Sequence, residues 1–258
     1  MIFFDFLRLP QKLCGLAADF FFPDCCVLCG CLILPGMRAG PYPLCASCAR
    51  GLRFPEAPRC GLCSRPLISE KGLCMSCRRL APQEPTPDGN SAAFPFKENI
   101  SVFVYQDPGV AELVVSYKGR KKRSLAAFFA EKLLAEYRTR WDGIPLVPVP
   151  CRHDSLKKRG FDPIGLMCRE MKKRGGPEIL RLLARRGKTL EQKKLNRDGR
   201  QKNLRGALAA RRRLPAALPR AVVLVDDVFT TGATAAACAQ TLKDMGIDEV
   251  YVLTIALD

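Results

Sequence analysis

The chain has 258 residues, of which 48% are hydrophobic and 26% are charged. This length allows a core for one or two domains, and this composition excludes a chain that is disordered throughout. The formal net charge is +17, and residues 118–213 hold the whole excess, with 29 basic and 9 acidic side chains. Such a bias favours polyanionic partners such as phosphates, pyrophosphate or nucleic acid, although a solvated basic surface would give the same count.

The first 22 residues are apolar but are interrupted by four charged side chains. They lack the pattern of a secretory signal, and no run of about 18 apolar residues suggests a membrane span. Apolar residues from Leu13 to Phe21 recur at helical spacing. Residues 1–22 are therefore predicted to form an amphipathic helix that packs on protein, and we expect the chain to be cytoplasmic.

Cysteine is unusually frequent, with fourteen residues in total and eleven of them before residue 78. Eight form CxxC pairs, a spacing that lets two thiolates of one tight turn face the same tetrahedral ion. In a reducing compartment, paired cysteines indicate metal binding rather than disulfides. The pairs are Cys26 and Cys29, Cys45 and Cys48, Cys60 and Cys63, and Cys74 and Cys77.

Pairing in chain order predicts two structural zinc sites, the first from Cys26, Cys29, Cys45 and Cys48, and the second from Cys60, Cys63, Cys74 and Cys77. An interleaved cross-brace would use the same eight residues. Gly30 suits the bend of a zinc knuckle, which favours Cys26 over Cys25 as the ligand. Residues 23–80 are predicted to be a double zinc ribbon that depends on its metal for stability. The six other cysteines are interpreted as small apolar packing residues.

A linker rich in proline and small polar residues is predicted at 81–95, followed by a second domain at 96–258. Strands are predicted at 101–106, 144–150, 178–186, 221–227 and 249–257, and helices at 109–118, 124–138, 161–174 and 233–245. Because strands alternate with helices, the predicted fold class is α/β with a mainly parallel sheet. Residues 187–203 are basic without periodicity and are predicted to form a long loop.

The segment LVDDVFTTGAT, residues 224–234, combines the features of a ligand site. Asp226 and Asp227 end an apolar strand, and ligands bind beyond the carboxyl ends of strands in open parallel sheets. The threonine hydroxyls and the free backbone amides at the start of the next helix form a cradle for an anion. Gly232 has no side chain and lets the anion approach the backbone closely. The two carboxylates suit the vicinal hydroxyls of a sugar, directly or through Mg²⁺. The alternative is a polar strand end followed by a helix cap.

This segment resembles the phosphoribosyl diphosphate (PRPP) motif of type I phosphoribosyltransferases. From about Pro23 onward the chain resembles the competence protein F (ComF) family, which includes proteins linked to gluconate utilisation. The motifs that carry this resemblance are the PRPP motif, the CxxC pairs, YKGR (117–120), LVPVPCRHDSLKKRGF (146–161) and KNLRGAL (202–208). In that family the sequence R-G-F-N-Q usually follows the VPVP loop. This chain departs from it with Asp162 and Pro163 after Phe161.

The resemblance implies a type I phosphoribosyltransferase fold that binds PRPP or a related ribose 5-phosphate ligand, with Mg²⁺ bridging the diphosphate and the ribose. Asp226 and Asp227 would be the catalytic pair on the ribose hydroxyls. The 5′-phosphate would lie on Thr230, Thr231, Gly232, Ala233 and Thr234, and the pyrophosphate on Arg152, Lys158, Arg159 and Gly160. The loop at 187–203 could close over this site.

Two functions fit these residues. The first is a phosphoribosyltransferase with an unidentified acceptor. The second is a non-catalytic sensor of PRPP or a nucleotide, whose zinc ribbons and basic surface contact single-stranded DNA or proteins of DNA uptake. The only histidine, His153, has no identifiable partner base, so no catalytic role is predicted for it. Lys118 is interpreted either as a ligand contact or as part of a solvated basic turn.

Overall fold

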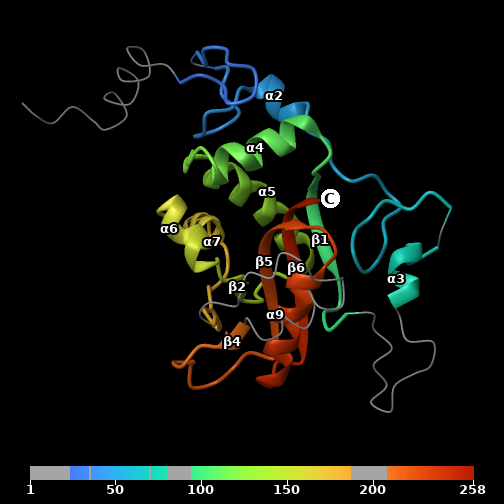
Figure 1. Ribbon diagram of the computed structural model, residues 1–258. Helices are drawn as coiled ribbons and strands as arrows, with labels where there is room; N and C mark the ends of the chain where they lie inside the picture. The colour runs from blue at the N-terminus through green and yellow to red at the C-terminus, as the bar shows by residue number, and fades with distance from the viewer. Residues whose placement is uncertain (1–23, 35, 70, 81–93, 187–207) are drawn as a thin grey trace, which may run out of the picture. The chain divides into compact units, whose positions relative to one another are not determined.

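The computed structural model describes residues 24–34, 36–69, 71–80, 94–186 and 208–258, and Figure 1 shows their ribbon. The chain divides into two compact units, the first ending at Leu52 and the second running from Arg53 to Asp258. The second pair of CxxC motifs therefore shares a unit with the sheet. The domain boundaries inferred from composition stay a prediction. The helix predicted at 1–22, the loop predicted at 187–203 and nearly all of the linker lie outside the described residues.

The described part of the first unit is a small knuckle followed by helix α2 (Ala46–Arg50). Short antiparallel bridges join Cys25 to Leu32 and Arg38 to Cys45. Its buried apolar residues other than cysteine are Ile33, Tyr42, Leu44 and Leu52. This core is too small to support a fold of its own, so the bound metal must supply much of its stability.

The second unit is built on one four-stranded sheet in which all neighbouring strands are parallel. In spatial order the strands are β1 (Asn99–Val104), β6 (Glu249–Leu257), β5 (Ala221–Phe229) and β2 (Leu146–Pro148). The run Val222–Val225 has no exposed surface. Strands of a parallel sheet are covered on both faces, which explains their continuous apolar sequence.

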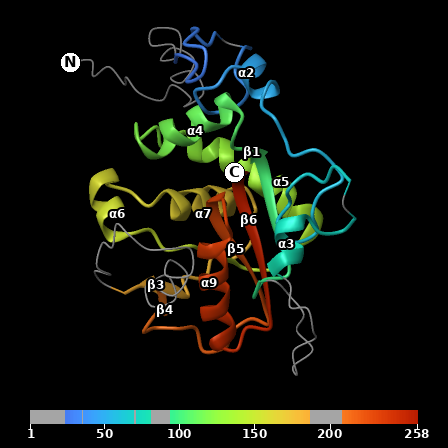
Figure 2. The same ribbon diagram turned by 45° about the vertical axis from the view of Figure 1, so that its right-hand side comes forward.

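Helices cover both faces of the sheet (Figures 1 and 2). Helix α9 (Ala233–Asp244) lies on one face, and helices α5 (Leu125–Arg140) and α7 (Pro163–Lys173) lie on the other. Because side chains alternate along a strand, Val222 and Leu224 of β5 join the core beneath α9, whereas Val223 between them faces the opposite layer. The remaining long helix, α4 (Pro108–Lys118), packs on α5.

Two elements differ from the sequence-based expectation. The predicted loop after β2 contains helix α6 (His153–Arg159). Its sequence shows no helical periodicity, because Leu156 is its only apolar residue. The strand predicted at 178–186 is reduced to β3 (Leu183–Arg185), which pairs with β4 (Leu208–Ala210) in an antiparallel ribbon. Only a single bridge, from Ile179 to Leu146, continues the main sheet at this edge.

A buried polar network attaches the second cysteine cluster to the edge strand β1. The side-chain amide of Asn99 donates to the carbonyl oxygen of Cys63 over 3.2 Å and to the hydroxyl of Ser101 over 3.0 Å. The hydroxyl of Ser64 donates to the carbonyl oxygen of Asn99, and the hydroxyls of Ser101 and Thr254 are 2.7 Å apart. A satisfied network of this kind fixes the relative position of the elements it joins.

Candidate functional site

The eight CxxC cysteines form two separate clusters, grouped in chain order. Within each cluster, the four Sγ atoms all lie within 4.8 Å of one another. The first contains Cys26, Cys29, Cys45 and Cys48, and the second contains Cys60, Cys63, Cys74 and Cys77. The interleaved cross-brace is therefore not the arrangement in this structure.

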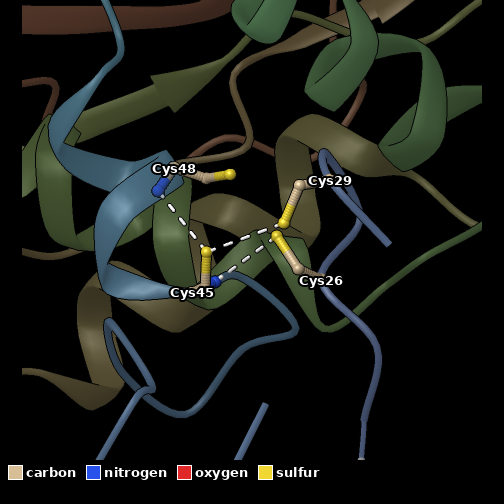
Figure 3. Close-up of side chains that lie close together, drawn as sticks. All are labelled: Cys26, Cys29, Cys45 and Cys48. Carbon is tan, nitrogen blue, oxygen red and sulfur yellow. Dashed lines mark hydrogen bonds between the residues drawn. The ribbon is translucent and has the colours of Figure 1, made fainter. Parts of the chain in front are cut away.

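The sulfur geometry fits tetrahedral zinc. Each Zn–S bond is about 2.3 Å, which places the sulfur atoms of a tetrahedral site about 3.8 Å apart. The Sγ atoms of Cys29 and Cys45 are 3.9 Å apart, and those of Cys63 and Cys74 are 3.7 Å apart. Figure 3 shows the first cluster, in which Cys26 and Cys29 of the knuckle approach Cys45 and Cys48 at helix α2.

Hydrogen bonds favour the thiolate form that zinc requires at some of these cysteines, whereas burial raises the pKa of Cys48 and the hydrogen bond with Cys63 raises that of Cys77. The backbone of Cys31 lowers the pKa of Cys29 to about 6, and the thiol of Cys77 lowers the pKa of Cys63 to about 5. The knuckle glycine Gly30 has φ +72°, as the bend requires. Ser64 takes the same place in the second cluster with φ +64°, and its hydroxyl bond to Asn99 supports this left-handed conformation.

The cysteines outside the clusters are not one class. Cys168 and Cys238 are fully buried, as expected for packing residues. Cys25 is exposed, and the sulfur of Cys31 lies 3.2 Å from that of Cys29, so the packing interpretation is wrong for these two. Cys151 lines the pocket at the end of the sheet. The partial exposure of Cys25, Cys31 and Cys151 cannot be recognised from sequence spacing alone.

A pocket of about 200 Å³ opens at the carboxyl ends of β2 and β5. Its charged and polar lining includes Arg152, Arg159, Arg185, Asp226, Asp227 and Thr234. Five of these six were predicted site residues, from two separate segments of the sequence. Lys158 and Gly160 do not line this pocket, and neither does His153.

The two aspartates are held in different surroundings. The carboxylate of Asp227 lies 2.5 Å from the ammonium nitrogen of Lys118. The carboxylate of Asp226 accepts from the backbone N–H of Asp227 over 2.9 Å. Burial, followed by repulsion from Asp227, raises the pKa of Asp226 to about 7. One carboxylate is therefore paired with a cation, whereas its neighbour is poised between its two protonation states.

The threonine and glycine loop leads directly into α9. Gly232 has φ +74°, and the hydroxyl of Thr231 accepts from the backbone N–H of Ala233 over 3.4 Å. A Cβ atom at Gly232 would lie 2.8 Å from the ring of Phe229 and 3.2 Å from that of Phe94. Only glycine satisfies both the backbone angle and the packing here. Thr230 and Thr231 are exposed and, unlike Thr234, do not line the pocket; Gly232 and Ala233 do not line it either.

Arg185 is the pocket residue that sequence reasoning missed. Its Nε–H donates to the carbonyl oxygen of Pro150 over 2.9 Å, which brings β3 against the end of β2. Burial and the nearby charge of Arg152 lower the pKa of Arg185. No motif marks this arginine, because its place depends on the contact between two segments that are 35 residues apart.

The departure at Asp162 and Pro163 has a local structural role. Asp162 caps α7 by accepting from the N–H of Gly165 over 3.1 Å, and Pro163 occupies the first turn, where it needs no donor. The Tyr117 hydroxyl donates to the carbonyl oxygen of Pro163 over 2.7 Å. The guanidinium of Arg123 lies 5.0 Å from the ring centre of Phe161. The substituted loop is therefore well supported by the YKGRKKR segment.

Comparison with known proteins agrees with both parts of this structure. A family model described as a double zinc ribbon domain matches residues 17–78. DNA utilization protein YhgH of Salmonella typhi is 31% identical over 218 residues, covering 81% of this chain and 94% of the relative. The chain belongs to the competence protein F (ComF) family. Competence protein F of Haemophilus influenzae is 25% identical over 219 residues, covering 83% of this chain and 90% of the relative.

The family model and the structure confirm the predicted architecture, a double zinc ribbon and an α/β domain with a parallel sheet. A hypoxanthine phosphoribosyltransferase from Staphylococcus aureus aligns with a TM-score of 0.32 at 13% identity, over 53% of this chain and 65% of that one. Among the described helices of this ComF protein, none has the length and apolar character to cross a membrane.

Proposed function

We propose that this ComF protein binds PRPP or a related ribose 5-phosphate ligand at the pocket between β2 and β5. The observation that carries the proposal is the convergence of two carboxylates, three arginines and the start of α9 on one pocket. Carboxylates suit ribose hydroxyls, whereas arginines and a helix start suit phosphates. A ligand that combines a sugar with phosphates uses all of these groups at once.

In this proposal, Asp226 and Asp227 hold the 2′- and 3′-hydroxyls of the ribose. Residues 230–234 receive the 5′-phosphate, and Arg152 and Arg159 face the diphosphate. Lys118 shares its charge between Asp227 and the incoming ligand. Bound Mg²⁺ would neutralise part of the negative charge of the diphosphate. The basic side chains of the pocket do not balance that charge alone.

We further propose that the bound ligand reacts, which makes the protein a phosphoribosyltransferase with an unidentified acceptor. Pyrophosphate would leave the anomeric carbon as the acceptor bonds to it, through a sugar cation that the adjacent carboxylates stabilise. Arg152 and Arg159 would stabilise the charge that develops on the departing pyrophosphate. The names of the relatives, competence protein and DNA utilization protein, suggest that this chemistry serves the uptake or use of DNA.

Calorimetry tests the ligand proposal. The wild-type protein should bind PRPP in the presence of Mg²⁺, and the double variant Asp226→Asn/Asp227→Asn should bind it at least about tenfold more weakly, since each lost charged hydrogen bond is worth about 1.5–3 kcal/mol. Asp248→Asn removes an exposed carboxylate elsewhere and is the matched control. Absence of binding by the wild type would refute the ligand proposal. Pyrophosphate release on adding nucleobases then separates an enzyme from a protein that only binds.

The alternative function is a non-catalytic sensor of PRPP or a nucleotide that also binds single-stranded DNA or uptake proteins. The concentration of basic residues in 118–213 favours it. Binding to phosphates in a nucleic-acid backbone weakens steeply with salt because counterions are released. A single-stranded oligonucleotide titrated at increasing salt should show that slope, and a flat or absent response counts against the alternative.

A further inference from the structure

The two cysteine clusters are built on the same local fold, so they can be compared position by position. In each, the N–H of the first cysteine donates to a carbonyl oxygen five residues further along, and the residues that flank this loop form an antiparallel bridge. The equivalent hydrogen bonds run from Cys26 to Cys31 and from Cys60 to Arg65, each over 2.8 Å, and the equivalent bridges are Cys25–Leu32 and Arg59–Pro66. The first knuckle therefore has cysteine at two positions, 25 and 31, where the second has arginine.

One of these two additional cysteines contacts a zinc ligand. The Sγ atoms of Cys31 and Cys29 are 3.2 Å apart, closer than the 3.9 Å between Cys29 and Cys45 within the cluster. The chain turns back at Gly30, which has φ +72°, and this turn brings the two sulfur atoms together. A fifth sulfur does not fit a tetrahedral zinc site, so Cys31 is left as a thiol beside a ligand.

The two clusters also differ in exposure. All four cysteines of the second cluster are buried, whereas Cys29 of the first cluster is exposed and Cys48 is half-buried. Cys31 is also only half-buried. The oxidation of a thiolate depends on its access to solvent. A dissolved oxidant therefore reaches the pair Cys29 and Cys31 more readily than it reaches the second cluster.

We propose that Cys29 and Cys31 form an oxidation site, at which a peroxide joins the two sulfur atoms in a disulfide and so abolishes the first zinc site. The thiolate of Cys29 attacks one oxygen of hydrogen peroxide, the O–O bond breaks, and hydroxide leaves. The thiol of Cys31 then attacks the sulfur of the resulting sulfenic acid. The S–S bond forms and the S–O bond breaks, and water leaves with the thiol proton. The two sulfur atoms lose two electrons, which one hydrogen peroxide gains.

The disulfide removes one of the four ligands of the first cluster. Structural zinc sites are closed sets of four ligands, so the three remaining thiolates, those of Cys26, Cys45 and Cys48, hold zinc less tightly. The first unit has a small apolar core and depends on its metal, so we expect its fold to be lost with the ion. The oxidation site is independent of the proposed PRPP pocket, which belongs to the other unit.

Peroxide treatment of the full-length protein, loaded with zinc at both clusters, tests the proposal. A colorimetric chelator that traps released zinc should detect one ion per chain, while the second cluster keeps its ion. Tandem mass spectrometry should find a disulfide between Cys29 and Cys31. Added dithiothreitol and zinc should restore the lost ion, because a disulfide is reversible.

The decisive variant is Cys31→Ser, which keeps all eight ligands and should bind the same amount of zinc as the wild type. Its release of zinc under peroxide should be at least about tenfold slower, because no thiol is held beside the oxidised sulfur. Cys25→Ser is the matched control. It removes the other additional thiol of the same knuckle and should release zinc at the wild-type rate.

Four results would overturn the oxidation site. They are release of zinc from both clusters at one rate, absence of the disulfide between Cys29 and Cys31 after oxidation, an equal rate of release in Cys31→Ser, and loss of an ion from Cys31→Ser before any oxidation. The last result would make Cys31 a ligand rather than a neighbour of one. Disulfide mapping uses the wild-type protein, so it decides the matter even if a variant fails to fold.

Discussion

The side-chain amide of Asn99 donates a 3.2 Å hydrogen bond to the carbonyl oxygen of Cys63 and so connects a zinc ligand to the edge strand of the sheet. The backbone N–H of Asn99 also donates to the carbonyl oxygen of Leu62 over 2.8 Å. Asn99 has no exposed surface. The second cysteine cluster and the four-stranded sheet are therefore parts of one folded unit, as the division of the chain also indicates.

Replacing Asn99 by alanine should lower the free energy of unfolding of this unit by about 2–4 kcal/mol, because several buried polar groups lose a partner together. Urea unfolding followed by the fluorescence of Trp141 measures the change, since this buried residue is the only tryptophan and packs on Tyr251 of the sheet. Gln106→Ala removes an exposed amide contact and should have little effect. Equal midpoints for the two variants would contradict the structural role of Asn99.

The two zinc clusters should differ in what their loss does to the sheet. Cys60 belongs to the same core as Phe94 and Phe96 beneath α9, so Cys60→Ser should shift the Trp141 unfolding transition to markedly lower urea concentration. Cys26 belongs to the other unit, so Cys26→Ser should leave that transition nearly unchanged. Each variant should lose one of two zinc ions in metal analysis. Equal shifts of the transition in both variants would show that the units do not unfold separately.

Gly232→Ala should weaken PRPP binding and destabilise the protein by about 1–3 kcal/mol beyond the cost of backbone strain alone. The comparison is Gly143→Ala, which carries the same left-handed strain at φ +85° but has open space around its Cβ position. The difference between the two variants in urea unfolding isolates the collision with Phe229 and Phe94. Identical losses of stability would mean that backbone strain, rather than contact with the two rings, selects glycine at position 232.

The raised pKa of Asp226 makes stability depend on pH. Its pKa of about 7 in the folded chain exceeds the ordinary value of 3.8, mainly because of burial, although Lys118 and Arg185 act in the opposite direction. The folded state then holds the proton more tightly than the unfolded state, so the free energy of unfolding should fall as pH rises from about 4 to about 7.

Asp226→Asn should remove this slope and should be more stable than the wild type above about pH 7, where the loss is complete. Urea unfolding of both proteins at matched pH values measures the difference and cancels the contribution of the zinc thiolates. Asp248→Asn, which alters an exposed carboxylate, should follow the wild-type curve. Parallel curves for Asp226→Asn and the wild type would contradict the shift.

Features that depend on local pattern could be predicted from the sequence. The apolar run Val222–Val225 indicated a strand of a parallel sheet, and the eight paired cysteines indicated two metal sites. Features that depend on long-range contact could not. The bond from Asn99 to Cys63 joins residues 36 apart, and Arg185 reaches the pocket only because β3 packs against the end of β2. The pairing of the CxxC motifs in chain order was predicted and is confirmed, although only the folded chain excludes the interleaved alternative.

The predicted pocket residues show the same division. Asp226 and Asp227 come directly after an apolar run, so their place near the carboxyl end of the strand could be inferred, although β5 continues to Phe229. Lys158 was grouped with its neighbours in the basic loop, but that loop folds as helix α6, which turns Arg159 into the pocket and leaves Lys158 exposed. A seven-residue helix with one apolar residue has too little periodicity to be recognised in advance.

The way the chain from Arg53 to Leu62 runs beside β1 affects how this protein can be shortened. The N–H of Val104 donates to the carbonyl oxygen of Arg53 over 3.1 Å, just as that of Asn99 donates to Leu62. A truncation within the linker at 81–95 would remove these acceptors and leave unpaired backbone groups on the edge strand β1. Such an edge can pair with strands of other molecules and cause aggregation. A truncation just before Arg53 keeps the edge covered and should give the soluble fragment.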